Sequence, residues 1–237
     1  MQQNELIRIE KLLSQEGILS RREAKRALEE GKIRLRGKIL NPGEKVAKEE
    51  IALLEFDRDL EIEKKKKETY LVYKPRGYTS SKDGEKNIFH VFPQFSHLNT
   101  VGRLDKESEG LILLSNDGLI TKAVTGKKHK IEKEYVVTVR EDVLPWMIKK
   151  MEKGMVLEDG PTLPVKAERL SRHRFRITLR EGRKHQIRRM ANKLRLTVTS
   201  LKRTRIHNLT IGRMLPGNFR KLKPEEVEEI KRYAKDN

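Results

Sequence analysis

Residues 102–118 read Gly102-Arg103-Leu104-Asp105-Lys106-Glu107-Ser108-Glu109-Gly110-Leu111-Ile112-Leu113-Leu114-Ser115-Asn116-Asp117-Gly118. The four consecutive apolar residues 111–114 are typical of a buried strand, and the Asn-Asp-Gly that follows them is a turn signal. Asp105 therefore lies in a loop directly before a buried strand, and Gly110 allows the chain to turn into it. A carboxylate at this point can face a cleft, although an aspartate that only hydrogen-bonds a turn shows the same pattern.

From residue 70 onward the chain alternates between strand and helix patterns on both sides of this stretch. Apolar and β-branched runs predict further strands over 70–73, 135–139 and 175–179, and helical spacing predicts a helix over 186–194. The tail from Pro224 has its acidic residues first and its basic residues last, the charge order that favours a helix. These patterns predict an α+β domain over residues 70–237.

Residues 1–63 form a separate small module. Helical spacing and a closing glycine predict a first helix with an inner face made of Leu6, Ile9, Leu12 and Leu13. Ser20 followed by Glu23 is a capping-box pattern that opens a second helix. Apolar residues around Arg36-Gly37-Lys38 predict a hairpin. Residues 64–69 begin with four lysines that repel one another, so we expect an extended linker there.

One flank of the predicted second helix is basic. The side chains that share it are Arg21, Arg22, Lys25 and Arg26. Residues 20–38 hold 8 basic and 3 acidic residues, whereas residues 39–63 hold 3 basic and 8 acidic ones. The module is therefore polarised, as an RNA-binding module would be, although two ordinary helices with solvated charges have the same pattern.

The excess positive charge of the chain is concentrated near its C-terminal end. The formal net charge is +19, and residues 172–223 hold 17 Lys or Arg residues but one acid, Glu181. Arginines at 172, 174 and 176 alternate with apolar residues, as in a strand with one basic face. Such a face suits a polyanion, usually nucleic acid, because it offers cations to phosphates. A solvated basic face without a partner is the alternative.

Several kinds of chemistry are excluded by what the sequence lacks. It has no cysteine, no GxGxxG or P-loop pattern, no GxSxG, and no HExxH spacing among its six histidines. We therefore expect no metal and no cofactor, and chemistry that depends on carboxylates, tyrosine and arginine. No run approaches the roughly 18 apolar residues of a membrane span, and the start is not a signal peptide. The expected location is the cytoplasm.

Four segments in order resemble the motifs of bacterial ribosomal RNA pseudouridine synthases of the RsuA-like family. They are residues 73–77, 102–118, 133–135 and 181–190. Residues 8–37 resemble the RNA-binding module named after ribosomal protein S4. The likeness covers nearly the whole chain, and Asp105-Lys106 together with residues 202–205 most resembles the branch that modifies large-subunit RNA (RluB, RluE and RluF), with RluF-like enzymes closest.

The resemblance implies a fold and a set of catalytic residues. The fold would be α+β, with a mainly antiparallel mixed sheet flanked by helices and an active cleft across it. Asp105 would supply the essential carboxylate, either by covalent attack or by stabilising the separated ribose and base. Arg188 would be its ion-pair partner and keep it ionised. Tyr135 would stack on the target base and can move a proton. A phosphate contact for Arg188 and a core position for Tyr135 are the alternatives.

The same resemblance assigns substrate contacts. Arg103 would fill the space left by a flipped base, Leu111 and Ile187 would line the uracil pocket, and Lys74 and Arg183 would hold structure or phosphate. We expect Arg203 and Arg205 to contact RNA, together with the basic flank of the second helix.

The expected function is cofactor-free isomerisation of uridine to pseudouridine in ribosomal RNA, with the large subunit favoured. The expected partner is ribosomal RNA or an assembling ribosomal subunit, with no membrane and no nucleotide cofactor, and the expected state is a monomer. The alternative is a non-catalytic RNA-binding assembly factor. A DNA-binding protein is disfavoured because no helix-turn-helix or zinc-finger pattern is present.

Overall fold

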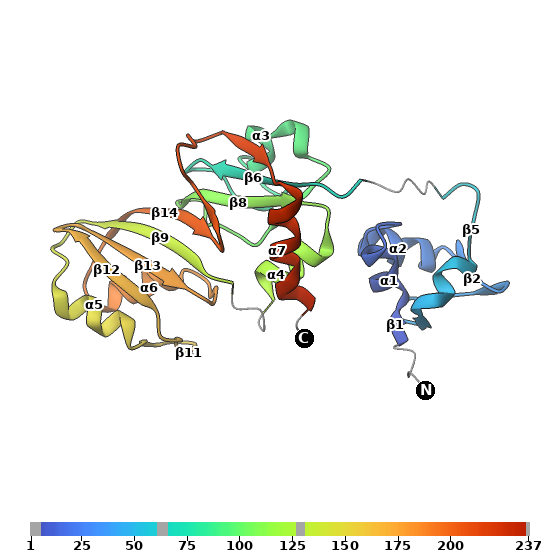
Figure 1. The fold of residues 1–237 in the computed structure, drawn as a ribbon, viewed down its shortest axis with the longest axis horizontal. Coiled ribbons are helices and arrows are strands. Elements are labelled where there is room, and N and C mark those ends of the chain that lie inside the picture. Colours follow the sequence, from blue (N-terminus) through green and yellow to red (C-terminus); the bar gives the residue numbers. More distant parts are fainter. Residues whose placement is uncertain (1–5, 61–65, 127–130, 236–237) are drawn as a thin grey trace. The chain divides into compact units, whose positions relative to one another are not determined.

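The computed structural model describes residues 6–60, 66–126 and 131–235 of the 237-residue chain, which divides into two units. Unit 1 is Met1–Lys67 and unit 2 is Glu68–Asn237 (Figure 1). The division falls within the predicted linker 64–69, of which residues 64 and 65 lie outside the described part.

Unit 1 has two helices packed against short strands. The helices are α1 (Ile9–Gln15) and α2 (Arg21–Glu29). The predicted capping box at α2 is confirmed, because the Glu23 amide donates to the Ser20 hydroxyl over 3.2 Å and the Ser20 amide donates to the Glu23 carboxylate over 2.7 Å. The assignment of Leu6 to the first helix was wrong. Leu6 begins β1 (Leu6–Arg8), which pairs with β4 (Lys45–Ala47), and its side chain is 58% exposed.

The predicted hairpin of unit 1 is confirmed. It joins β2 (Ile33–Leu35) to β3 (Lys38–Ile39), and β5 (Leu54–Phe56) pairs with the other edge of β2 after the 3₁₀ helix η1 (Lys48–Leu53). Arg36 and Gly37 both have positive φ, which is what a two-residue hairpin turn requires. The basic residues of segment 20–38 thus lie on α2 and in or directly before the β2–β3 hairpin.

Unit 2 is built on one twisted sheet with the strand order β12-β13-β9-β14-β8-β6-β16. In that order the strands are Lys166–Ser171, Arg174–Leu179, Lys133–Val139, Val198–Ile206, Glu109–Ser115, Thr69–Lys74 and Phe219–Lys221. β7 (Asn99–Val101) also pairs with β8, and β15 (Leu209–Thr210) pairs with β14. Within the described sheet every pairing is antiparallel except β14 with β8. The predicted α+β fold with a mainly antiparallel mixed sheet is confirmed.

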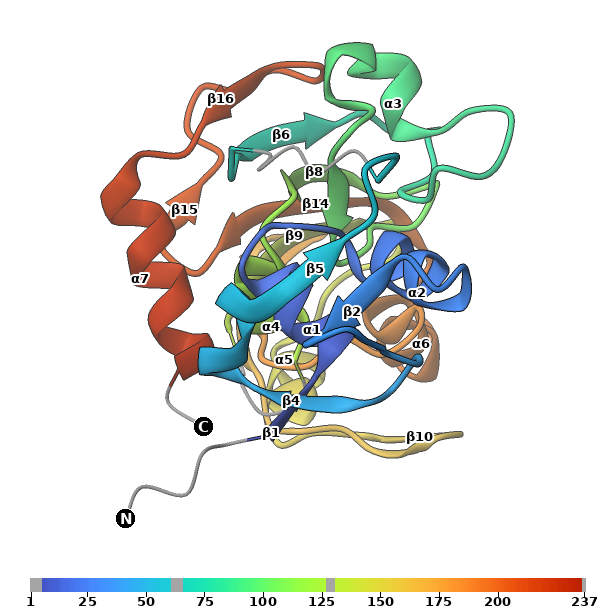
Figure 2. The same ribbon diagram turned by 90° about the vertical axis from the view of Figure 1, so that its right-hand side faces the viewer.

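Helices cover both faces of this sheet. They are α3 (Ile88–Val91), α4 (Gly118–Thr125), α5 (Pro145–Glu152), α6 (Gln186–Lys193) and α7 (Pro224–Lys235). The 3₁₀ helix η2 (Pro93–Phe95) follows α3, and a small hairpin of β10 (Val156–Leu157) and β11 (Gly160–Pro161) follows α5. α4 and α7 lie side by side against β6 and β8 (Figures 1 and 2).

The alternation of side chains shows which helices share a face. α5 and α6 pack on Val137 and Phe175, while α3 packs on Ile112. α4 and α7 pack on Leu111, which points the opposite way from its neighbour Ile112. Tyr135 packs against both the core under α5 and α6 and the core under α3. It therefore lies on the face shared by α3, α5 and α6, at the boundary between the two cores.

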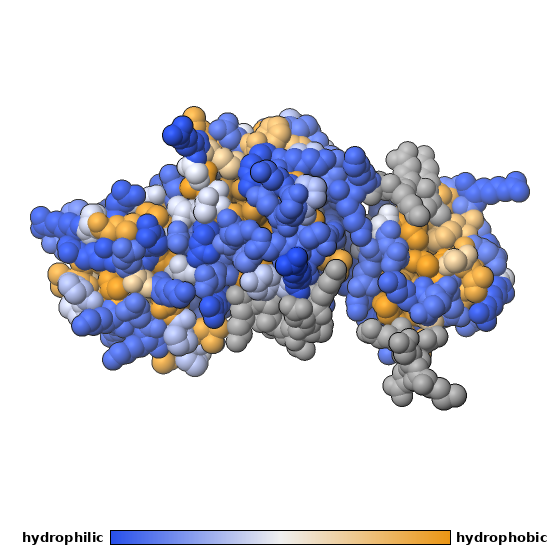
Figure 3. Space-filling model, viewed as in Figure 1, coloured by the Kyte–Doolittle hydropathy of each residue, from blue (hydrophilic) through white to orange (hydrophobic). Residues whose placement is uncertain are grey.

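The surface of unit 2 agrees with the high charge of the sequence. Figure 3 shows a visible face that is mostly hydrophilic, with smaller hydrophobic patches. In the part of the chain that the structure describes, no helix is both long and apolar enough to cross a membrane.

Candidate active site

The loop that carries Asp105 joins β7 to β8 and is held by hydrogen bonds to its backbone. The buried hydroxyl of Ser80 donates to the carbonyl of Leu104 over 2.8 Å and accepts from the amide of the same residue over 2.9 Å. One residue beyond Asp105, the carbonyl of Lys106 accepts from the amide of Gly77 over 2.8 Å. The backbone on both sides of Asp105 is thus fixed to the segment that follows β6.

Two arginines hold the same loop from other elements. Nη2 of Arg188, on α6, donates to the carbonyl of Glu107 over 3.1 Å. Nη1 of Arg203, on β14, lies 3.4 Å from the carbonyl of Arg103. Three distant segments of the chain therefore meet at this loop, which is a preorganised setting for a reacting group.

Gly110 allows β8 to approach β14 at the centre of the sheet. Its φ is 108°, and a Cβ at this position would lie 2.3 Å from the carbonyl oxygen of Arg203. Only glycine fits such a contact. In the register of the sheet, Arg203 is paired with Gly110 on one side and with Tyr135 on the other.

Arg203 is buried, with 2% of its surface exposed. Its Nε donates to the carbonyl of Leu111 over 2.5 Å, and its Nη1 lies 3.5 Å from the hydroxyl of Tyr135. Its guanidinium carbon is 6.0 Å from the centre of the Tyr135 ring, a cation–π distance. Nη2 is buried and has no hydrogen-bond partner in the described part of the chain. The expected phosphate contact of Arg203 is not possible from this position; Arg203 instead links Tyr135 to the Asp105 loop.

Arg205 faces the other side of the sheet because β14 contains a bulge between Arg203 and Arg205. Beyond the bulge Arg205 lies opposite Glu134, the neighbour of Tyr135, so the two arginines point to opposite faces. Nη2 of Arg205 is 3.1 Å from Glu132, and Nε is 3.6 Å from Glu134. Arg205 is therefore neutralised by carboxylates and is not the free RNA contact that its sequence position suggests.

One of these carboxylates, Glu134, also pairs with an arginine of β13 that was expected to offer its charge to phosphate. Nε of Arg176 is 3.7 Å from Glu134, and Nη1 is 2.7 Å from Glu168. The predicted alternation is present, since Phe175 and Ile177 are buried while Arg176 points away from the core. This face is a network of ion pairs rather than a row of free cations.

The carboxylate of Asp105 is accessible, with 38% of its side chain exposed. Among the described residues, the side chain within ion-pair distance of it is His185, whose Nε2 lies 3.4 Å from Oδ1. The expected direct ion pair with Arg188 is not formed in the described structure. Arg188 instead reaches the loop through Glu107 and lies 3.5 Å from the carbonyl of Val198.

Sequence reasoning placed His185 in a motif but gave it no role. No clear sequence signal indicates this contact, because His185 precedes α6 and its left-handed backbone is not a helical position. The side chains of His185 and Arg188 both reach the Asp105 loop. His185 contacts the carboxylate of Asp105, and Arg188 donates to the backbone carbonyl of Glu107.

Lys74 lies fully buried at the end of β6. Its Nζ donates to the carbonyls of Pro75 and Tyr78 over 2.9 and 2.7 Å. Burial lowers the pKa of this ammonium to about 8, although the charge of Asp105 raises it in part. Of the two roles expected for Lys74, the structure shows the structural one, since a buried ammonium does not reach an RNA phosphate.

Arg183 also holds structure. Its Nη1 donates to the carbonyls of Asp159 and Gly160 over 3.3 and 3.0 Å, and its Nη2 donates to the carbonyl of Pro161. It therefore fixes the β10–β11 hairpin to the segment before α6.

The remaining predicted contacts are divided between the core and the surface. Leu111 is fully buried on the face opposite Tyr135, so it does not share a pocket wall with that tyrosine. Ile187 is buried in the core against which Tyr135 packs. Arg103 is exposed, and its guanidinium has no partner among the described residues.

The basic flank of α2 is exposed in unit 1, as the sequence predicts. Lys25 and Arg26 lie 3.5 and 3.9 Å from the carboxylates of Glu29 and Glu30, while the described structure gives Arg21 and Arg22 no partner.

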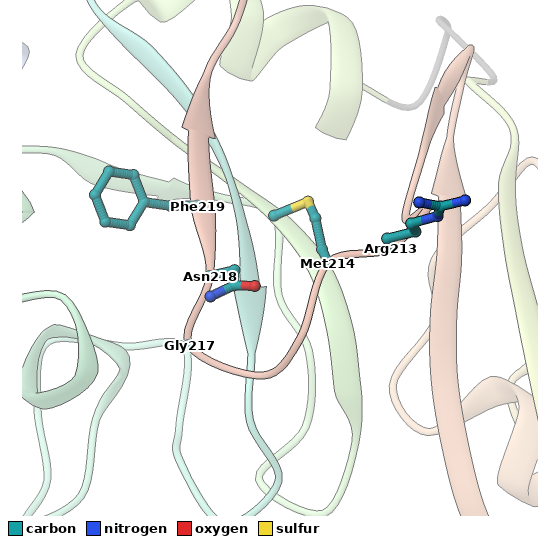
Figure 4. A pocket seen from close by; sticks show the side chains of 5 residues that line it. All are labelled: Arg213, Met214, Gly217, Asn218 and Phe219. Atoms are coloured by element: carbon teal, nitrogen blue, oxygen red, sulfur yellow. The ribbon is translucent and has the colours of Figure 1, made fainter.

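One shallow hollow of about 400 Å³ lies elsewhere in unit 2 (Figure 4). It is lined by Arg213, Met214, Gly217, Asn218 and Phe219, between β15 and β16. Asp105 is not part of its lining, so the hollow is not the reaction site. Among the described residues no three His, Asp or Glu side chains gather as a metal site requires.

Comparison with known proteins matches each unit to a family model. The family model described as RNA pseudouridylate synthase matches residues 68–193, and the S4 domain model matches residues 7–51. An uncharacterized RNA pseudouridine synthase of Aquifex aeolicus is 37% identical, covering 98% of this chain and 99% of the relative. The ribosomal large subunit pseudouridine synthase B of Bacillus subtilis is 32% identical, covering 96% of each chain.

Two further relatives extend this likeness. The dual-specificity RNA pseudouridine synthase RluF of Escherichia coli (strain K12) is 33% identical, covering 94% of this chain and 78% of the relative. A solved structure described as that of a pseudouridylate synthase superposes with a TM-score of 0.71 at 28% identity, covering 94% of this chain and 99% of that one.

Proposed function

We propose, because this chain belongs to the RNA pseudouridylate synthase family, that it converts a uridine of ribosomal RNA into pseudouridine and that Asp105 is its essential carboxylate. The large ribosomal subunit is the proposed source of the substrate. Relatives that align over most of the chain are named for the large subunit or as RluF, which supports this choice. The S4 domain is proposed to bind the same RNA through the basic flank of α2. We place the enzyme in the cytoplasm as a monomer.

The reaction needs no electron acceptor and no transferred group. The bond between N1 of uracil and C1′ of ribose breaks, the base turns, and a bond forms between C5 and C1′. The proton leaves C5 and one is held at N1, so the atoms of substrate and product balance. Side chains that stabilise charge and position the base are sufficient, and the carboxylate, hydroxyl and guanidinium groups around Asp105 are of this kind.

The observation that carries the proposal is the setting of Asp105. Its carboxylate is partly exposed on a loop whose backbone is fixed from the segment after β6, from α6 and from β14. A carboxylate that only stabilised a turn would not need this number of anchors. Arg203 connects the same loop to the hydroxyl of Tyr135, and this tyrosine is the group that we propose contacts the base.

Asp105→Asn tests the proposal, since it keeps the shape of the side chain and removes its charge. The variant is expected to bind a ribosomal RNA transcript as tightly as the wild type and to form no pseudouridine, measured by mass spectrometry of the digested RNA. Asp83→Asn, at an exposed aspartate in another loop, is the control and is expected to retain full activity. Near-wild-type turnover by Asp105→Asn would remove Asp105 from the reaction. A separate experiment identifies the target uridine: the pseudouridines of ribosomal RNA are mapped in cells that lack the protein, and the missing site is the target.

A further inference from the structure

His185 has a backbone conformation that is uncommon for any residue other than glycine. Its φ is 51° and its ψ is 28°, in the left-handed region that glycine and asparagine adopt most readily. It also occupies the N-cap of α6, where Ser, Thr, Asp or Asn is preferred. Its side chain caps nothing, because it makes no hydrogen bond to the first turn of the helix. The end of the helix therefore does not explain a histidine at this position.

The side chain of His185 lies against the carboxylate of Asp105. Its Nε2 is 3.4 Å from Oδ1, and both side chains are partly open to solvent, with 49% of the ring and 38% of the carboxylate exposed. Strained backbone positions of this kind concentrate at functional sites, where the surrounding structure holds them in place.

The segment around His185 is fixed on both sides. The next residue, Gln186, is tied to the residues before His185: its side chain accepts from the amide of Arg183 over 3.2 Å and donates to Glu181 over 2.5 Å. Further along α6, Arg188 donates to the carbonyl of Glu107 in the Asp105 loop. The imidazole and the carboxylate are thus held by two segments that are themselves tied together.

We propose that His185 is a positioning residue for the reaction. Its ring nitrogen holds Oδ1 of Asp105 and thereby sets the rotation of the carboxylate, so that Oδ2 is the oxygen directed at the reacting ribose. This inference rests on the role proposed above for Asp105. It also assigns a reason for the left-handed backbone, since the ring reaches the carboxylate from this conformation.

The test uses substitutions that suit the backbone better than histidine does. His185→Gly and His185→Asn both favour the left-handed N-cap, so a purely structural role predicts that stability and activity are kept or improved. A positioning role predicts a fall of about 10- to 100-fold in the single-turnover rate on full-length enzyme with saturating ribosomal RNA. The RNA dissociation constant should stay within roughly two-fold of wild type, which separates positioning from RNA binding. His185→Gln, which keeps a donor of similar reach, should recover part of the rate.

Arg195→Gly is the matched control. Arg195 lies just beyond the other end of α6, is exposed, and has a φ of 58°. This control relieves the same backbone conformation without touching Asp105, and its single-turnover rate should equal that of the wild type. A rate within roughly two-fold of wild type in both His185→Gly and His185→Asn would overturn the inference. So would a loss caused entirely by weaker RNA binding.

A second measurement is independent of catalysis. The ring ¹⁵N shifts of His185 in the free protein should change in Asp105→Asn, and unchanged shifts would show that the two side chains do not interact. A wild-type enzyme that forms no pseudouridine in ribosomal RNA would refute the proposed function itself. An active wild type with an inactive Asp105→Asn variant preserves that function whatever the His185 variants do.

Discussion

Gly110→Ala should damage unit 2 more than any other single added methyl group at its glycines. The residue has a φ of 108°, and the new Cβ would lie 2.3 Å from the carbonyl oxygen and 2.8 Å from the amide nitrogen of Arg203. Both atoms belong to the backbone of the central strand β14, so neither can rotate away. The strand must move, and it carries the guanidinium that holds the Asp105 loop.

The expected cost has two parts. A positive φ in an L residue costs about 1–2 kcal/mol, and overpacking against a fixed neighbour costs about 1–3 kcal/mol more. The free energy of unfolding should therefore fall by about 2–5 kcal/mol, and the melting temperature of a unit this size by about 2–4 °C per kcal/mol. Urea denaturation followed by circular dichroism measures the first quantity and calorimetry the second.

Gly160→Ala separates the two parts. Gly160 has a φ of 100°, but a Cβ there would meet nothing within 4 Å. It should therefore show the backbone cost alone. If Gly110→Ala and Gly160→Ala were equally destabilising, the close approach of β8 and β14 would have no energetic weight and the reasoning would fail. The residual folded fraction of Gly110→Ala should also lose pseudouridine formation, because the Asp105 loop follows the displaced strand.

Two other predictions concern buried and exposed cations. Burial lowers the pKa of Lys74 from 10.5 to about 8. Between these values the unfolded chain binds the proton that the folded chain has lost, so this residue makes the protein more stable as the pH rises. In urea denaturation, the stability of wild type relative to Lys74→Met should accordingly grow by about 3 kcal/mol from pH 8 to 10.5, and a constant difference would contradict the buried ammonium. On α2, Arg21→Glu with Arg22→Glu should weaken binding of ribosomal RNA and reduce its log–log salt slope by about 0.7–0.9 per lost phosphate contact. Lys45→Glu changes an exposed charge on β4 of the same unit and is the control, which should leave the slope unchanged. An unchanged slope in the double arginine variant would show that α2 does not touch RNA.

The regular elements could be predicted because each depends on neighbours in sequence. The apolar run 111–114 is the centre of β8, and the Ser20 and Glu23 pair caps α2 through bonds three residues apart. Leu6 was misassigned for the opposite reason. Its helical spacing was overridden by pairing with Ala47, which lies 41 positions away and has no local signal.

The site was only partly predictable for the same physical reason. The sequence motif indicated that Asp105 precedes a buried strand and is accessible, and the structure places it there. The bulge in β14 left no recognisable pattern, so Arg203 and Arg205 were both expected to contact RNA. The bulge directs Arg203 into the core and Arg205 to the carboxylates of the other face. The contact of His185 depends on a backbone angle, which residue type alone would not suggest.

The two halves of the sheet in unit 2 are joined by the parallel pairing of β8 with β14, which spans two residue pairs. The antiparallel pairings on either side are longer, with six pairs between β6 and β8 and seven between β14 and β9. A junction with so few hydrogen bonds opens at lower free energy than the strands around it. Under gentle heating or low denaturant, the enzyme should therefore become inactive while its helices and most of its strands are still intact.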